Sequence, residues 1–183
     1  MVARSRLAPL LQGDSQGDSQ GDSQGAQGMR GCGLPDAGND AIFARMNESV
    51  RIVYARESTV AVADFRRVLV DSGLGAIRPV DDEPRLQTML DNANLIVTAR
   101  REGELIGVAR CFTDFSWSCY LSELAVSPSA QGLGIGQGLL DEARRQLGPS
   151  VSLILASVPE AVGFYERAGM ARIHEAFWYK RER

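Results

Sequence analysis

The segment ELAVSPSAQGLGIGQGLL at 123–140 combines an apolar strand pattern, a proline turn, a glycine-rich stretch and an amphipathic helix. We expect the strand to end near Val126 and Gln131–Gly136 to lead into the helix. Glycines at such a junction let the backbone approach a ligand closely and aim free N–H groups at it. The helix N-terminus adds partial positive charge, so the junction predicts an anion site suited to a pyrophosphate.

Helical and strand patterns alternate on both sides of this junction. Period-2 and short apolar runs predict strands, and apolar stripes three and four residues apart predict helices. We expect strands at 50–56, 95–100, 105–112, 119–126, 151–157 and 172–180, and helices at 59–71, 83–92, 134–147 and 160–168. The order β-α-α-β-β-β-α-β-α-β predicts an α/β (α+β) fold, a mixed sheet with helices on its faces.

The chain divides into two unequal parts. Residues 12–25 read QGDSQGDSQGDSQG, and such a polar repeat cannot bury enough apolar surface to offset the entropy of the chain. We therefore expect a disordered, low-complexity extension over 1–45 and a folded domain over 46–183.

Composition excludes several classes of protein. The 183 residues carry 20 basic and 23 acidic side chains, a net charge of −3, without the basic excess typical of nucleic-acid binders. Lys180 is the one lysine, three residues from the end, so neither a P-loop nor a pyridoxal-phosphate lysine can be placed. With His174 as the one histidine, the sequence predicts no metal site.

Cysteines and hydropathy bear on the compartment. Cys32, Cys111 and Cys119 lack C-x-x-C spacing and are typical of reduced thiols in a cytosolic protein. No stretch approaches the ~18 apolar residues of a membrane span, and the apolar part of 1–11 is too short for a secretory leader. We expect a cytoplasmic protein with neither a membrane nor a nucleic-acid partner.

The glycine spacing distinguishes between phosphate-binding motifs. The dinucleotide pattern G-x-G-x-x-G fails, because its last glycine falls on Gln137 or on Leu139. The stretch fits Q/R-x-x-G-x-G/A instead, and Leu124–Gly136 resembles the GNAT superfamily of acetyl-CoA-dependent N-acetyltransferases. The resemblance covers roughly 50–180 and implies a splayed central sheet, with acetyl-CoA as co-substrate. It implies coenzyme contacts from Leu124, Ala125, Val126, Gln131, Gly132, Leu133, Gly134, Ile135, Gly136, Gln137 and Ala161.

A second motif strengthens the resemblance. AVGFYERAG at 161–169 fits the family's A-x-x-x-Y-x-x-x-G helix, although Val158 and Met170 stand where Asn and Phe are common in the family. By resemblance, Tyr165 lies close to the coenzyme sulfur and protonates the departing thiolate. The alternative for Tyr165 is a packed aromatic on the apolar stripe of its helix.

The sequence supports a prediction of the oxyanion donors better than a prediction of the general base. By resemblance, a bulge splays the fourth strand and exposes backbone N–H groups over 124–126, which would stabilise the oxyanion. Glu123 is a candidate general base, and a structural or substrate-binding carboxylate is the equal alternative. Asp114, Tyr120 and His174 are weaker candidates.

The acceptor remains open. By resemblance, the connection 72–83 helps to close the acceptor site. It carries Asp81, Asp82 and Glu83, which could attract a cationic amine. We favour the alternative that they form a solvated loop and supply negative charge at a helix N-terminus. Trp117, Trp178 and Phe115 are candidates for an acceptor pocket, or for ordinary packing. The implied partners are a small-molecule amine or a protein amino group, and a homodimer is allowed.

Three classes of function follow. The favoured one is an acetyl-CoA-dependent N-acetyltransferase, an acyltransferase that works by direct attack of a primary amine in a ternary complex. The second is a non-catalytic acyl-CoA-binding module or sensor, which would keep 124–136 but need no acid or base. The third is an interaction protein that works through 1–45, and we rank it last because the repeat lacks aromatic residues and blocks of charge.

Overall fold

A computed structural model describes residues 51–182 of the chain. The expected extension over 1–45 and the domain boundary at Met46 lie outside the described residues.

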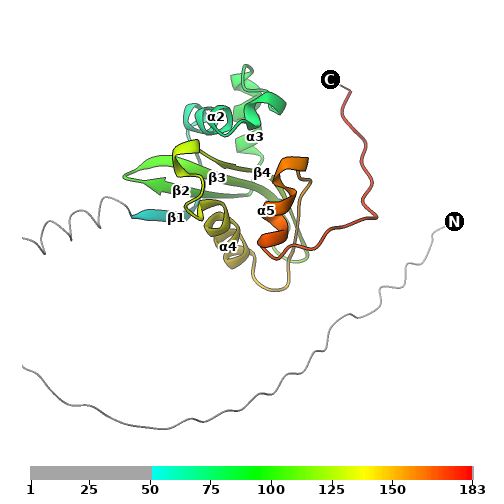
Figure 1. Cartoon of the computed structure of the whole chain (residues 1–183). Helices are drawn as coiled ribbons and strands as arrows, with labels where there is room; N and C mark the ends of the chain where they lie inside the picture. Colours follow the sequence, from blue (N-terminus) through cyan, green and yellow to red (C-terminus); the bar gives the residue numbers. More distant parts are fainter. Residues whose placement is uncertain (1–50, 183) are drawn as a thin grey trace, which may run out of the picture. The chain divides into compact units, whose positions relative to one another are not determined.

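The described residues form one sheet with helices on both faces (Figure 1). The strands are β1 (Ile52–Glu57), β2 (Leu95–Arg101), β3 (Glu104–Thr113), β4 (Ser118–Val126) and β5 (Ser152–Ile154). The helices are α2 (Val62–Asp71), α3 (Glu83–Asp91), α4 (Ile135–Leu147) and α5 (Val162–Arg167), with 3-10 turns at Leu74–Ile77, Pro128–Ala130 and Pro159–Ala161.

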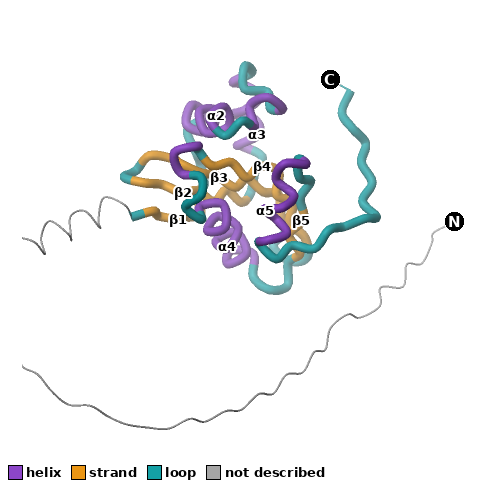
Figure 2. The backbone as a smooth tube through the Cα atoms, viewed as in Figure 1, coloured by secondary structure: helices purple, strands orange, loops and turns teal. Residues whose placement is uncertain are grey.

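The sheet is mixed. Its order is β1-β2-β3-β4-β5, and the first four strands are antiparallel neighbours while β5 runs parallel to β4. Helices α2 and α3 cover one face, and α4 and α5 cover the other (Figure 2). This arrangement confirms the predicted mixed sheet with helices on its faces.

Each face of the sheet has its own apolar core. The α4-side core joins Ile135, Leu139 and Ala143 of α4 to alternate residues of the sheet. The α2-side core joins α2 and α3 to the opposite face, with Phe65 and Leu86 fully buried. Burial of a side chain of this size contributes about 1.5–3 kcal/mol, so the apolar stripes determine which face of each helix meets the sheet.

Helix α4 packs closely on β1 because it carries a glycine at the contact. A Cβ atom at Gly138 would lie 2.7 Å from Cε1 of Tyr54, which is closer than real atoms approach. We therefore expect Gly138→Ala to destabilise the fold by about 1–3 kcal/mol, as overpacking does. Chemical denaturation of the variant measures this difference in the free energy of unfolding.

The same substitution in a variant without the Tyr54 ring tests whether overpacking against that ring is the cause of the destabilisation. In a Tyr54→Leu variant the ring is gone, and Gly138→Ala should then stabilise the helix by up to about 1 kcal/mol through its higher helix propensity. Equal destabilisation in both backgrounds would contradict the packing explanation.

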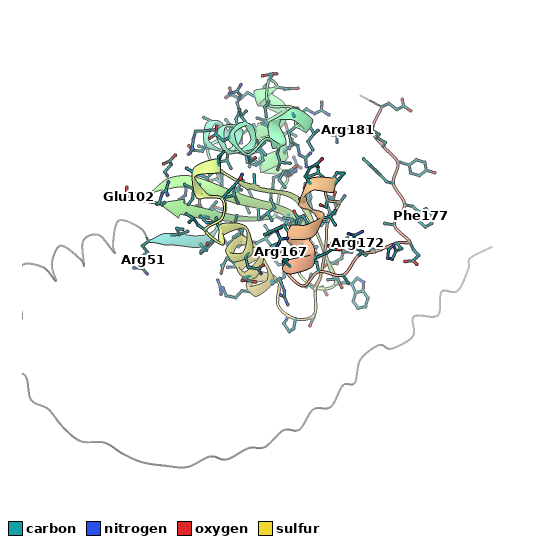
Figure 3. The ribbon with its side chains drawn as sticks, viewed as in Figure 1. Arg51, Glu102, Arg167, Arg172, Phe177 and Arg181 are labelled. Atoms are coloured by element: carbon teal, nitrogen blue, oxygen red, sulfur yellow. The ribbon has the colours of Figure 1, made fainter. Side chains whose placement is uncertain are left out.

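The predicted strand at 172–180 is wrong. Residues 171–182 form neither helix nor strand, and their side chains are exposed, with Phe177 at 99%. Figure 3 shows Phe177 on this extended segment, away from the sheet. An alternating pattern identifies side chains that could share a face, but a strand also needs a hydrogen-bonding neighbour. The outermost strand, β5, offers three residues rather than the expected 151–157.

Candidate active site

The sheet opens between β4 and β5. Their parallel pairing joins Ser118–Tyr120 to Ser152–Ile154, and β4 then continues to Val126 without pairing to β5. This confirms the expected splay. Backbone groups on the open edge of β4 are therefore available to a ligand that enters between the two strands.

A bulge interrupts β4 within this opening. Arg110 and Cys111 are consecutive in β3 but pair with Glu123 and Leu121, which leaves Ser122 as an extra residue. A residue inserted in this way bends the strand and shifts the alternation of its side chains. The bulge expected from the family resemblance is thus present.

The bulge reverses which side chains face which core. Leu121 lies in the α4-side core and Ala125 in the α2-side core, although four residues of regular strand would return to the same face. Leu124 and Val126 consequently pack on the α4 side, and Glu123 contacts residues on the α2 side.

The glycine-rich loop follows the end of β4. Gln131 donates a hydrogen bond from Nε2 to the carbonyl oxygen of Val126 at 3.0 Å, which ties the loop to the strand. Gly132 and Gly134 have φ of 77° and 76°, the left-handed conformation that favours glycine. Helix α4 begins at Ile135 without a side-chain cap.

This loop has the features of an anion site. The first intrahelical bond joins the N–H of Gly138 to the carbonyl of Gly134 at 2.9 Å, so the N–H groups of Ile135, Gly136 and Gln137 precede it. A Cβ at Gly132 or Gly134 would meet no atom within 4 Å, which leaves open space over the backbone. The residues present therefore fit the pyrophosphate of a coenzyme.

Helix α5 packs beside the first turn of α4. A Cβ at Gly136 would lie 3.0 Å from Cζ of Phe164, so that glycine allows the ring to approach. Phe164 meets Tyr165 edge to face, with centroids 5.0 Å apart, and both are partly buried and pack against the α4-side core. The structure thus gathers α5, the start of α4 and the end of β4 on one side of the sheet.

Tyr165 is positioned by the end of its helix. Gly169, at φ 82°, donates to the carbonyl of Glu166, and Met170 donates to the carbonyl of Tyr165, both at 3.0 Å. These two bonds form the left-handed cap that ends a helix at glycine. Burial raises the pKa of Tyr165, which keeps its hydroxyl protonated at neutral pH. Ala161 occupies the N-cap position of α5, where no side-chain hydrogen bond caps the helix.

Glu123 lies in a buried ion-pair cluster. Its Oε1 accepts from Nε of Arg78 at 2.7 Å and its Oε2 from Nε of Arg110 at 2.6 Å, and its side chain is 2% exposed. The Ser122 hydroxyl donates to Oε1 at 3.0 Å. The burial of this carboxylate among Arg78, Arg110 and Ser122 leaves a substrate amine little access to its oxygens. Of the two roles that the sequence leaves open for Glu123, this geometry favours the structural one.

The weaker base candidates lie elsewhere. Asp114 accepts from the N–H groups of 116–118 through one oxygen, and these bonds lower its pKa, as expected of a turn-forming carboxylate. His174 lies in the exposed C-terminal segment, and Tyr120 is half-exposed beside Ile154. None of the three joins the cluster around Glu123.

The acidic connection before α3 caps that helix. Asp82 accepts from the N–H of Arg85 at 3.0 Å, and Asp81 lies 3.6 Å from the guanidinium of Arg66. These contacts support the helix N-terminal role. Phe115 and Trp117 lie exposed in the turn between β3 and β4, and Trp178 is exposed in the C-terminal segment.

The side chains and helices of the described residues also bear on metal and membrane partners. Within 51–182, no group of three or more His, Cys, Asp or Glu side chains is arranged to hold a metal ion. No helix in that same range has both the length and the apolar content that crossing a bilayer requires. Cys111 and Cys119 are buried free thiols.

Comparisons with known proteins point to one family. A model described as "Acetyltransferase (GNAT) domain" matches residues 76–179. The chain is 24% identical over 107 residues to the uncharacterized N-acetyltransferase ycf52 of Pyropia yezoensis, covering 53% of this chain and 62% of that protein. It is 30% identical over 99 residues to the chloroplastic serotonin N-acetyltransferase 2 of Oryza sativa subsp. japonica, covering 51% and 50%.

A solved structure shares the fold. It is a GNAT family acetyltransferase of Streptococcus pneumoniae, with a TM-score of 0.58 and 24% identity, covering 72% of this chain and all of that one. This similarity supports the fold alone. The sequence matches span 62% and 50% of the lengths of the two curated relatives, so they leave the substrate open.

Proposed function

Since the chain belongs to the GNAT acetyltransferase family, we propose that it transfers the acetyl group of acetyl-CoA to a primary amine by direct attack in a ternary complex. The observation that carries this proposal is the glycine loop. Two left-handed glycines, an uncapped helix start and open space lie directly after the splayed end of β4. A pyrophosphate bound there would leave the rest of the coenzyme to extend into the splay.

The backbone of β4 supplies the oxyanion donors in this proposal. The amine nitrogen attacks the thioester carbonyl carbon, and negative charge develops on the carbonyl oxygen. N–H groups over Leu124–Val126 on the open edge would stabilise this charge, and such a donor can contribute ~3 kcal/mol to lowering the barrier. The unpaired edge beyond Tyr120 supports this assignment.

Tyr165 is proposed as the general acid. When the carbon–sulfur bond breaks, the thiolate needs a proton, and a neutral phenol within reach can donate it. Tyr165 packs against the same α4-side core as Leu124 and Val126, and this shared position supports the role. The proton of the acceptor amine would leave through water, since the Glu123 carboxylate is engaged by two arginines.

The acceptor class rests on the family. Members named for their substrate, such as the serotonin N-acetyltransferase above, act on an amine, and we propose the same class here. A small-molecule amine and a protein amino group both fit the proposal.

An amine panel tests this function. Release of coenzyme thiol from acetyl-CoA is measured with aryl-alkyl amines, polyamines, amino acids and peptides, beside calorimetric binding of acetyl-CoA without acceptor. We expect binding and amine-dependent thiol release with at least one class. Binding without turnover on any amine would favour the non-catalytic sensor instead.

A further inference from the structure

We propose that Arg78 is a positioning residue, which holds the β4 bulge in the shape that presents backbone N–H groups to the acetyl carbonyl. This inference rests on the proposed function, and it gives a role in the site to a residue that is far from β4 in sequence. Arg78 lies between the 3-10 turn Leu74–Ile77 and α3, on the connection that follows α2. Its partners in β4 are 44 and 45 residues away.

The contacts of Arg78 bracket the bulge. Its Nε donates to the Glu123 carboxylate at 2.7 Å, and its Nη2 donates to the backbone carbonyl of Ser122 at 2.9 Å. One planar guanidinium thus holds the extra residue and the next one together. Arginine presents several donors in a fixed fork, whereas lysine is a compact point charge that cannot span two acceptors in this way.

A second arginine holds the bulge from the neighbouring strand. Arg110 donates from Nε to Glu123 at 2.6 Å, from Nη2 to the Ser122 hydroxyl at 3.1 Å, and from Nη1 to the carbonyl of Met89 at 2.9 Å. Its side chain is 4% exposed. Arg78, Arg110, Ser122 and Glu123 therefore form a clamp with Glu123 at its centre. This clamp links β3, β4, α3 and the connection after α2 at the site of the bulge.

The clamp matters because the bulge determines the orientation of the next three residues. The side-chain alternation reverses at Ser122, so Leu124 and Val126 face the α4 side where the loop and Tyr165 lie. A one-residue slip of a strand turns every following side chain to the opposite face. A displacement of about 1 Å in a reacting geometry can cost about 10²-fold in rate.

Arg78 can be removed with less risk to the fold than Arg110. Without Arg78, the Glu123 carboxylate keeps its bonds to Arg110 and to the Ser122 hydroxyl. The Arg78 side chain is 19% exposed, so water can occupy its place. Arg110 is only 4% exposed, so its loss would leave a space that water cannot readily enter, and it would also remove the donors to the carbonyl of Met89 and the hydroxyl of Ser122.

Arg66 provides a matched control. It donates from Nε to the carbonyl of Val80 at 2.7 Å and pairs with Asp81, so its hydrogen bond and its ion pair within the described residues are to the connection that also carries Arg78, not to β4. Arg66→Met therefore loosens the connection without touching the bulge. A difference between Arg78→Met and Arg66→Met isolates the contact with β4.

The experiment measures kcat, the Kd for acetyl-CoA and Tm in Arg78→Lys, Arg78→Met and Arg66→Met, with the best acceptor of the panel. We expect both Arg78 variants to lose about 10- to 100-fold in kcat, with the coenzyme Kd within about threefold because the loop is intact. Millimolar methylguanidine should restore part of the kcat of Arg78→Met. An Arg78→Met kcat within about twofold of wild type, or an equal loss in Arg66→Met, would overturn the proposal.

Hydrogen exchange tests the role of Arg78 without requiring that the chain has the proposed activity. If the wild-type chain turns over no amine, the proposed function fails. The effect of Arg78 on the bulge can then still be measured by hydrogen exchange of the backbone amides. Exchange of the N–H groups around the end of β4 that donate to β3, such as that of Ser127 to the carbonyl of Ile106, should then be at least about tenfold faster in Arg78→Met than in Arg66→Met. Equal exchange in the two variants would overturn the positioning role whatever the activity.

Discussion

Gly134→Asp is expected to abolish acetyl-CoA binding while the chain stays folded. The new side chain would enter the open space over the loop, where no atom lies within 4 Å of the added Cβ. Its carboxylate would face the pyrophosphate, and such like-charge contact costs several kcal/mol, a loss of about 100-fold or more in affinity. Calorimetry with acetyl-CoA measures the loss, and Tm checks the fold.

Gly134→Asn is the matched control. Asparagine and aspartate both tolerate the left-handed backbone at φ 76°, and they have nearly the same size. We expect Gly134→Asn to retain much more affinity than Gly134→Asp, because it lacks the negative charge. Near-normal affinity in a folded Gly134→Asp variant would exclude this loop as the pyrophosphate site.

Tyr165→Phe is expected to lower kcat by roughly 10²–10⁴-fold if the hydroxyl protonates the thiolate. The ring and its edge-to-face contact with Phe164 remain, so packing on the α4-side core should survive. Acetyl-CoA affinity should change little, since the lost interaction forms in the transition state. Steady-state kinetics and calorimetry together separate these two effects.

Two further measurements examine this assignment. Tyr54→Phe is the control, because burial also raises the pKa of Tyr54 but its ring packs against α4 near Gly138. Since burial raises the pKa of Tyr165, the phenol stays protonated up to a higher pH than the usual ~10, and kcat should fall only above that. Turnover of Tyr165→Phe within about twofold of wild type would leave Tyr165 as a packing residue.

Much of the fold could be predicted from local sequence. The apolar stripe of α4 predicts the helix found at Ile135–Leu147, and the paired runs around Gly103 predict the hairpin of β2 and β3. Such patterns are periodic within a single element, because burial of one face requires apolar residues at regular spacing. The strand expected at 172–180 failed because its pattern says nothing about a neighbour to pair with.

The arrangement around Glu123 could not be predicted in the same way. Ser122 has no property that marks it as an extra residue, because a bulge depends on the pairing register with β3. Arg78 and Arg110 lie 45 and 13 residues from Glu123, and contacts at that separation leave no periodic pattern. A buried glutamate between two arginines is visible only once the chain is folded. Sequence alone therefore left the base and structural roles equal.

A single-turnover experiment with isotope-labelled acetyl-CoA tests the proposed acetyl transfer most directly. The wild-type chain is mixed with labelled acetyl-CoA and the best amine of the panel, quenched at intervals, and the label is followed by mass spectrometry. Direct attack in a ternary complex predicts that labelled amide and free coenzyme A appear at the same rate, with no label on the protein. Label retained on the protein, or coenzyme A released without labelled amide, would contradict it.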